Sequence, residues 1–175
     1  MKLTPKFNVA DLMKGVRSEI EKMEQLIITK LNRVGLQFVI NARSKVSSKE
    51  YKDALGSMSH AKGMRRAELG PDSPSFTDRT GNLRSSIGYK IFQNGISVSE
   101  NFEKSGKGSD PEKGVQKAKD FADEVARNTD FNTGFLLVCV AGMEYAVYVE
   151  GYGYDVITGS SLLAENDLKE AFRKL

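Results

Sequence analysis

Apolar residues recur at every third or fourth position through the first quarter of the chain, with one adjacent pair at Leu12 and Met13. The stripe consists of Val9, Leu12, Met13, Val16, Ile20, Met23, Ile27, Leu31, Val34, Phe38 and Ala42. This spacing predicts an amphipathic helix over about residues 9–45, with Asn8 as its N-cap and Gly15 as a place where it could break. Because the spacing drifts more than a strict heptad, it favours a helix lying across a sheet over a coiled coil. Unbroken, the helix would be about 50 Å long, so we expect one end to overhang the domain and to be covered by a second subunit.

A turn followed by a strand is predicted between Phe76 and Phe92. Thr80 can act as an N-cap, Gly81 relieves crowding, and Leu83 can pin the turn to a core. The apolar residues then alternate, as they do in a strand, at Ile87, Tyr89 and Ile91. Asn94-Gly95 is a strong hairpin signal, and a returning strand begins at Ile96.

The second half of the chain alternates between helix and strand signals. Asp110 and Pro111 open a predicted helix that ends near Arg127 and interrupts an antiparallel meander. The apolar run Phe135–Ala141 suits a central strand covered on both faces. The segment from Tyr145 to Glu150 fits either a strand or a helical turn. A short extended piece is expected from Asp155 to Thr158, followed by a last helix capped by Ser160 or Ser161.

Together these signals predict one α+β domain spanning residues 1–175. A long N-terminal helix and a C-terminal helix pack on a small antiparallel sheet of about four strands, with a helix inserted between strands. The expected segments are 1–46 (N-terminal helix), 47–75 (a flexible or inserted segment), 76–100 (turn and hairpin), 101–132 (inserted loop and helix) and 133–175 (strand, Tyr-Val-Glu segment and C-terminal helix).

The composition is that of an ordinary globular protein. The chain has 175 residues, is 39% hydrophobic and 28% charged, and carries a net charge of +3. Its 26 basic residues are interspersed with 23 acidic ones, so a dedicated nucleic-acid groove is not implied. Apolar runs fall short of the roughly 20 residues that cross a bilayer, and the first residues lack a signal peptide's apolar middle, so we expect synthesis in the cytosol and no membrane partner.

The residues offer no catalytic, cofactor or metal constellation. Cys139 and His60 are the only cysteine and histidine, so they form no intramolecular disulfide and no structural zinc site. Cys139 lies in an apolar run, where burial makes a poor nucleophile. The chain contains neither a dinucleotide fingerprint nor a nucleophile elbow. Two alternatives remain open: a Ser or Cys hydrolase, and a nucleic-acid-binding module that uses Lys62, Arg65, Arg66, Arg79 and Arg84.

Two motifs go beyond this physical description. DRTGNLRSSI, residues 78–87, is followed much later by AGMEYAVYVEGYGYDVI, residues 141–157. In this order and separation they resemble the tail-completion family of long-tailed bacteriophages, also described as head–tail joining, neck or minor tail components. The chain departs from that family in the long segment before the first motif, in the inserted helix, and in having Gly-Tyr-Gly-Tyr-Asp after Tyr-Val-Glu instead of the more usual Phe-Gly-Thr.

The resemblance implies a non-enzymatic protein of the virion neck, made in the bacterial cytoplasm. It would form a homo-oligomeric ring, commonly a hexamer, between the portal-side connector and the tail-tube or tail-terminator proteins. DNA would pass through its lumen without sequence-specific binding, and no cofactor is implied. The matched positions are Thr80, Gly81, Asn82, Leu83, Arg84, Ser86, Ile87, Tyr145, Ala146, Tyr148, Val149 and Glu150.

These matched positions have structural readings as well. Leu83, Ile87, Ala146 and Val149 suit a core, and Thr80 to Asn82 suit the shaping of the turn. Arg84 and Glu150 either pair within the subunit or face a neighbour.

Overall fold

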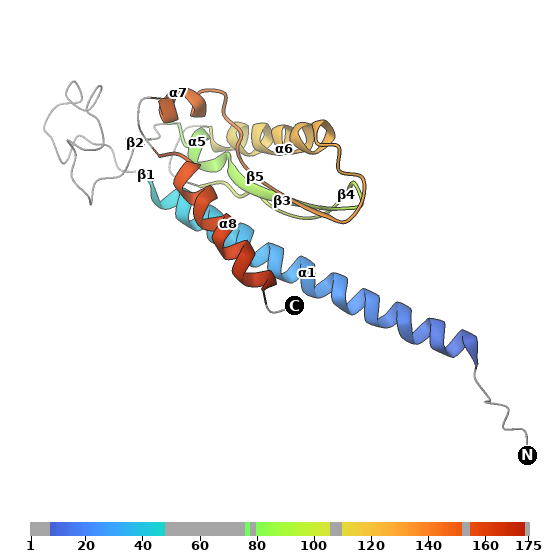
Figure 1. The fold of residues 1–175 in the computed structure, drawn as a ribbon. Helices are drawn as coiled ribbons and strands as arrows, with labels where there is room; N and C mark the ends of the chain where they lie inside the picture. Colours follow the sequence, from blue (N-terminus) through green and yellow to red (C-terminus); the bar gives the residue numbers. More distant parts are fainter. Residues whose placement is uncertain (1–7, 48–75, 78–79, 106–109, 152–154, 174–175) are drawn as a thin grey trace, which may run out of the picture.

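The structure, a computed structural model, describes residues 8–47, 76–77, 80–105, 110–151 and 155–173. It is an α+β arrangement in which helices lie on both faces of a small antiparallel sheet (Figure 1). The helices are α1 (Val9–Ser44), α5 (Asn82–Ser85), α6 (Pro111–Asn128), α7 (Ala146–Gly151) and α8 (Thr158–Phe172). The strands are β1 (Val46–Ser47), β2 (Phe76–Thr77), β3 (Ile87–Gln93), β4 (Ile96–Asn101) and β5 (Phe135–Ala141).

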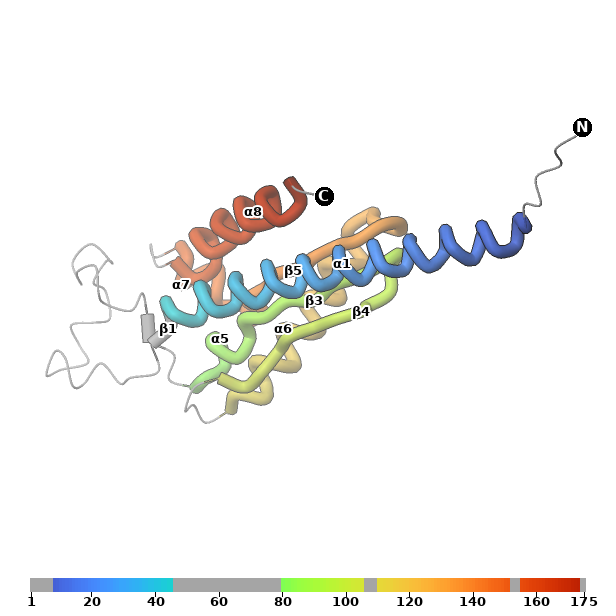
Figure 2. The backbone as a smooth tube through the Cα atoms, turned by 90° about the horizontal axis from the view of Figure 1, so that it is seen from below, coloured from blue at the N-terminus to red at the C-terminus, as the bar shows by residue number. Residues whose placement is uncertain are grey.

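Helix α1 runs unbroken for 36 residues, so Gly15 does not interrupt it. The predicted cap is confirmed: Asn8 Oδ1 accepts a hydrogen bond of 3.1 Å from the backbone N–H of Ala10. Within the described part of the chain, only the second half of α1 lies against other elements, and the first half projects beyond the sheet (Figures 1 and 2). The predicted overhang is therefore present, and it is the N-terminal end of the helix.

The main sheet has three strands in the order β4-β3-β5, where the sequence predicted about four. The hairpin between β3 and β4 is confirmed, with positive φ at Asn94 (51°) and Gly95 (78°). The prediction that β5 is a central strand was wrong, because it lies at the edge of the sheet and, among the described strands, pairs only with β3. The reason is the position of α6, which carries the chain across one face of the sheet to the free edge of β3. The predicted cover of β5 on both faces is confirmed, since its residues alternate between the two cores. β1 and β2 form a separate two-residue parallel pair.

The larger core lies between α1, α8 and one face of the sheet. Phe38 of α1 and Ile87 and Ile91 of β3 are fully buried there. A polar contact joins the same layers, because Asn32 Oδ1 accepts from Tyr89 Oη at 2.9 Å and from Ser99 Oγ at 2.7 Å. The packing and this paired polar group together hold the second half of α1 on the sheet.

A smaller core lies between α6 and the opposite face of the sheet. Ala118 and Ala122 of α6 are fully buried, and they pack with Phe92, Val138 and Val140. The contact is close where β5 ends, since a Cβ on Gly142 would lie 2.3 Å from the Cα of Ala118. The predicted inserted helix is thus confirmed and forms a layer of its own.

An ion cluster crosses the interface between the sheet and α6. Lys90 Nζ lies 2.7 Å from Asp123 Oδ1 and 3.4 Å from Glu100 Oε2, and Lys119 Nζ lies 2.6 Å from Glu100 Oε1. Burial acts to lower the pKa of Lys90, but the hydrogen bonds and charges of Asp123 and Glu100 outweigh burial and raise it. The pKa of Glu100 is lowered, first by the hydrogen bond from Lys119 and then by the charges of Lys119 and Lys90, against an opposing effect of burial.

The remaining differences from the sequence prediction concern short elements. The segment that fitted either a strand or a turn forms helix α7, and the piece from Asp155 to Thr158 forms no strand. Asp110 stands at the N-cap position of α6 but makes no capping hydrogen bond with its side chain. Helix α8 begins at Thr158, ahead of the serines expected to cap it.

Two glycines of α1 provide a matched test of this packing. A Cβ on Gly35 would lie 2.5 Å from Cγ of Tyr89, whereas a Cβ on Gly15 would meet nothing within 4 Å. We expect Gly35→Ala to lower the free energy of unfolding by about 1–3 kcal/mol through overpacking. Gly15→Ala should leave it unchanged or raise it by up to about 1 kcal/mol through helix propensity. Urea unfolding of both variants measures the difference, and a change of the same sign and size in the two would contradict the packing described.

The ion cluster predicts a specific pH dependence. Because the folded pKa of Glu100 is lowered, its contribution to stability is present above its unfolded pKa of about 4.3 and is lost as the pH falls through the folded value. Glu100→Gln should therefore be less stable than the parent at pH 7, with the gap closing towards pH 3. The control is Glu144→Gln, because the side chain of Glu144 is 86% exposed. Unfolding midpoints measured across pH 3–7 test this, and a gap that stays constant would refute it.

Candidate functional site

The first motif forms a tight turn whose backbone requires glycine at one position. Gly81 has φ of 75°, a left-handed conformation, and it stands at the N-cap position of α5. The hydroxyl of Thr80 accepts the predicted hydrogen bond, at 3.3 Å, from the backbone N–H of Asn82. The N-cap, however, is Gly81, one residue later than the sequence predicted. Leu83 is 1% exposed and pins the turn to the larger core.

The polar residues of this motif bind within the chain. Ser86 Oγ donates to the carbonyl of Leu83 at 2.9 Å, and Ser85 Oγ donates to the carbonyl of Ser105 at the same distance. Arg84 Nε donates to Ser105 Oγ at 2.8 Å. The bonds of Arg84 and Ser85 to Ser105 hold the segment after β4 against the turn, and the bond from Ser86 closes the turn itself. Arg84 and Ser86 therefore have a structural role.

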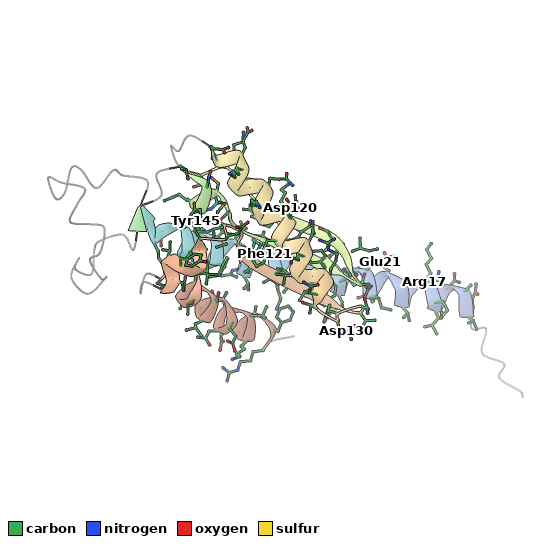
Figure 3. The ribbon with its side chains drawn as sticks, turned by 90° about the horizontal axis from the view of Figure 1, so that it is seen from above. Arg17, Glu21, Asp120, Phe121, Asp130 and Tyr145 are labelled. Carbon is green, nitrogen blue, oxygen red and sulfur yellow. The ribbon has the colours of Figure 1, made fainter. Side chains whose placement is uncertain are left out.

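The second motif forms helix α7 and divides into an inward and an outward side. Ala146 is buried and Val149 packs against the larger core. Three side chains face outward instead: Tyr145 is 37% exposed, Val147 75% and Tyr148 71%. We call these three residues the α7 face; Figure 3 labels Tyr145, which lies beside the start of this short helix. Val147 was not among the predicted site residues, because its exposure depends on this segment being a helix.

Glu150 caps the next helix. Its Oε2 accepts from the backbone N–H groups of Val156 (2.8 Å) and Ile157 (3.3 Å), and its Oε1 accepts from that of Thr158 (3.1 Å). A carboxylate at this position satisfies free N–H groups at the start of α8 and interacts favourably with the helix dipole. The sequence did not predict this capping role for Glu150; it left open whether Glu150 pairs with Arg84 or faces a neighbour.

A second carboxylate completes the start of α8. Asp155 Oδ1 accepts from the N–H of Gly159 at 2.9 Å, and its Oδ2 lies 2.6 Å from Lys45 Nζ at the end of α1. The two acidic residues take the place of the predicted serine cap, and Asp155 also ties α8 to α1.

The two motifs, far apart in sequence, meet at one end of the sheet. Ile87 pairs with Ala141 where β3 and β5 lie side by side, and the N–H of Gly142 donates to the carbonyl of Ser86 at 3.0 Å. Leu83, Ile87 and Ala146 belong to the same core. The structure therefore brings the motifs together as a folded unit and leaves the α7 face at its surface.

A second unusual surface is the exposed apolar side of the N-terminal half of α1. We call it the overhang stripe, and every member is more than 40% exposed. It consists of Val9, Leu12, Met13, Val16, Ile20, Met23 and Leu26. A row of this length exceeds the scattered apolar residues normal at protein surfaces. The sequence predicted the overhang from helix length alone.

The residues of the alternative functions are only partly described. Lys62, Arg65, Arg66, Arg79 and His60 lie outside the described residues. Arg84 is described and is half-buried against Ser105. Burial raises the pKa of the Cys139 thiol to about 12, so the reactive thiolate is strongly disfavoured at neutral pH.

Comparison of the chain with protein-family models, with curated proteins and with solved structures gives no match. Among the helices that the structure describes, none combines the length and the apolar character needed to span a membrane.

The cap formed by Glu150 can be tested by substitution. Glu150→Ala should lower the free energy of unfolding by about 0.5–2 kcal/mol, the range for loss of a helix cap. Glu144→Ala is the matched control, because this nearby carboxylate makes one exposed contact, with Lys117 at 3.2 Å. Thermal unfolding and the loss of helical circular dichroism report the effect. Equal stability of the two variants would remove Glu150 from this role.

Proposed function

We propose that this chain is a structural, non-enzymatic virion protein that joins the head connector of a tailed phage to its tail. The observation that carries the proposal is the meeting of the two motifs at one end of the sheet, with their apolar residues in a shared core and the α7 face directed outward. The resemblance rests on these two motifs, and their joint packing gives it a structural basis.

The chain would act as one copy in a ring, commonly a hexamer, between the portal-side connector and the tail-tube or tail-terminator proteins. Such a ring needs two different contact surfaces on each subunit, so that head-to-tail contacts can close. The α7 face lies at one end of the sheet. At the other end, edge strand β4 exposes Ile96 (70%) and Val98 (42%) beside the hairpin turn. We assign these two surfaces to the ring contact.

The charge of the chain fits a conduit for DNA. A net charge of +3 gives only a weak attraction to phosphates, so DNA in the lumen would pass without being gripped. Arg84 of the first motif is held within the subunit by Ser105, which supports turn formation over DNA contact.

Disruption of the gene in a phage or inducible prophage that carries it tests the proposal. We expect filled heads and separate tails by electron microscopy, and restoration of joined particles by the unchanged gene supplied in trans. Tyr148→Asp should fail to restore joining, because a charge would be buried at the α7 face. Asn166→Asp, at an exposed position of α8, should restore it.

Three results would contradict the proposal. Joined, infectious particles formed without the gene would exclude an essential joining role. Restoration by Tyr148→Asp would remove the α7 face from the contact. Tight, salt-dependent binding of nucleic acid by a monomer would favour the nucleic-acid-binding module instead.

A further inference from the structure

The overhang stripe has a spacing that differs from the rest of α1. The residues along the middle of this apolar face are spaced by strictly alternating steps of four and three residues. They are Val9, Met13, Val16, Ile20, Met23 and, just beyond the stripe, Ile27. This is the heptad spacing of a helix that packs along another helix. Beyond Ile27 the apolar residues are Leu31, Val34, Phe38 and Ala42, and steps of four residues follow one another at Ile27 and again at Phe38. The strict alternation therefore ends where α1 begins to pack on the sheet. The pattern therefore changes at the boundary between the bare and the covered half.

The covered half of α1 already has a helix beside it. Lys45, at the end of α1, pairs with Asp155 before the start of α8, and Lys30 Nζ donates to the carbonyl of Ala171 at its end. Helix α8 therefore runs antiparallel to α1 and ends at Phe172, whose ring centre lies 5.7 Å from Lys30 Nζ. Figure 2 shows α8 alongside only this half of α1. The overhang stripe begins where the row occupied by α8 ends.

We propose that the overhang stripe is covered by the same stripe of a second copy of this chain, in an antiparallel pair. The two-fold axis of the pair passes between the two helices at the level of residue 18. Helix α1 of the second copy then lies along the first half of α1, on the side where α8 lies along the second half. Val9 at the start of the second copy's helix lies opposite Ile27. The bare segment and the segment that covers it have the same length by symmetry. Each α1 is in this way lined by an antiparallel helix along its whole length.

Two leucines beside the seam favour the antiparallel direction. Leu12 and Leu26 flank the heptad positions on one side and lie at nearly equal distances from Ser18. In the antiparallel pair Leu12 meets Leu26 of the second copy, at both ends of the seam. A parallel pair would place Leu12 beside Arg17 of the other helix. Like-charged contacts do not separate the two directions: the antiparallel pair has Arg17–Arg17 and Glu19–Glu19, and the parallel pair has Glu19–Glu24 twice.

Helix stability gives an independent reason for a partner. A bare helix of this length is marginal in water and gains most of its stability from packing of an apolar face. Pairing would supply that packing for the first half of α1, and the opposed helix dipoles would be favourably aligned. This contact uses neither the α7 face nor β4, so it stands or falls separately from the proposed ring.

Light scattering and sedimentation of the full-length protein test the pair. We expect a concentration-dependent dimer. Ile20→Glu should weaken it by about 100-fold or more, because an unpaired charge would be buried in the seam. Ser18→Glu is the matched control, since it adds the same side chain on the opposite side of the same helix, and it should leave dimerisation unchanged. Circular dichroism shows whether both variants keep the fold.

Cysteine cross-linking tests the direction. In a Cys139→Ala background, Met13→Cys and Met23→Cys should form a disulfide with each other when the two variants are mixed, and neither should cross-link with itself. Self-linked Met13→Cys or Met23→Cys would indicate a parallel pair and overturn the proposal. So would a monomer at about 100 μM, near the concentrations at which weak protein pairs form. A larger oligomer that Ile20→Glu leaves intact would equally place the contact elsewhere.

Discussion

The packing of one half of α1 on β3 is the contact on which the rest of the fold depends. Phe38, Ile87 and Ile91 are fully buried there, and α8 closes the same core from the side. The second half of a 36-residue helix is committed to this core, and the rigidity of the helix carries the first half past the sheet. The position of the overhang is thus a direct result of where the core ends.

The elements with a strong local signal could be predicted from the sequence. The apolar stripe from Val9 to Ala42 predicted α1, the Asn94-Gly95 pair predicted the hairpin, and Pro111 predicted the start of α6. In each case the deciding interactions are between neighbours in sequence. The turn at Thr80 and Gly81 belongs to the same class, because its hydrogen bond spans two residues.

The features that sequence reasoning missed depend on distant contacts. The apolar run Phe135–Ala141 resembles a central strand because α1 and α6 cover both faces of β5, yet β5 lies at the edge of the sheet. Similarly, α8 is capped by Glu150, which lies eight residues before the helix begins, whereas the sequence pointed to Ser160 and Ser161, which lie inside the helix. Val147 became a site residue once α7 was known to be a helix. The spacing of residues close together in the sequence predicts none of these three features.

The close contact between Gly142 and Ala118 has a consequence for the evolution of this chain. A Cβ on Gly142 would lie 2.3 Å from the Cα of Ala118, so helix and strand meet backbone to backbone. Surface segments that connect two strands usually tolerate insertions and deletions among related proteins. Here the segment between β4 and β5 forms half of a core and supplies Asp123 and Lys119, which pair with the buried Lys90 and the exposed Glu100 of the sheet. Once acquired, α6 could be lost only together with matching changes in β3 and β5.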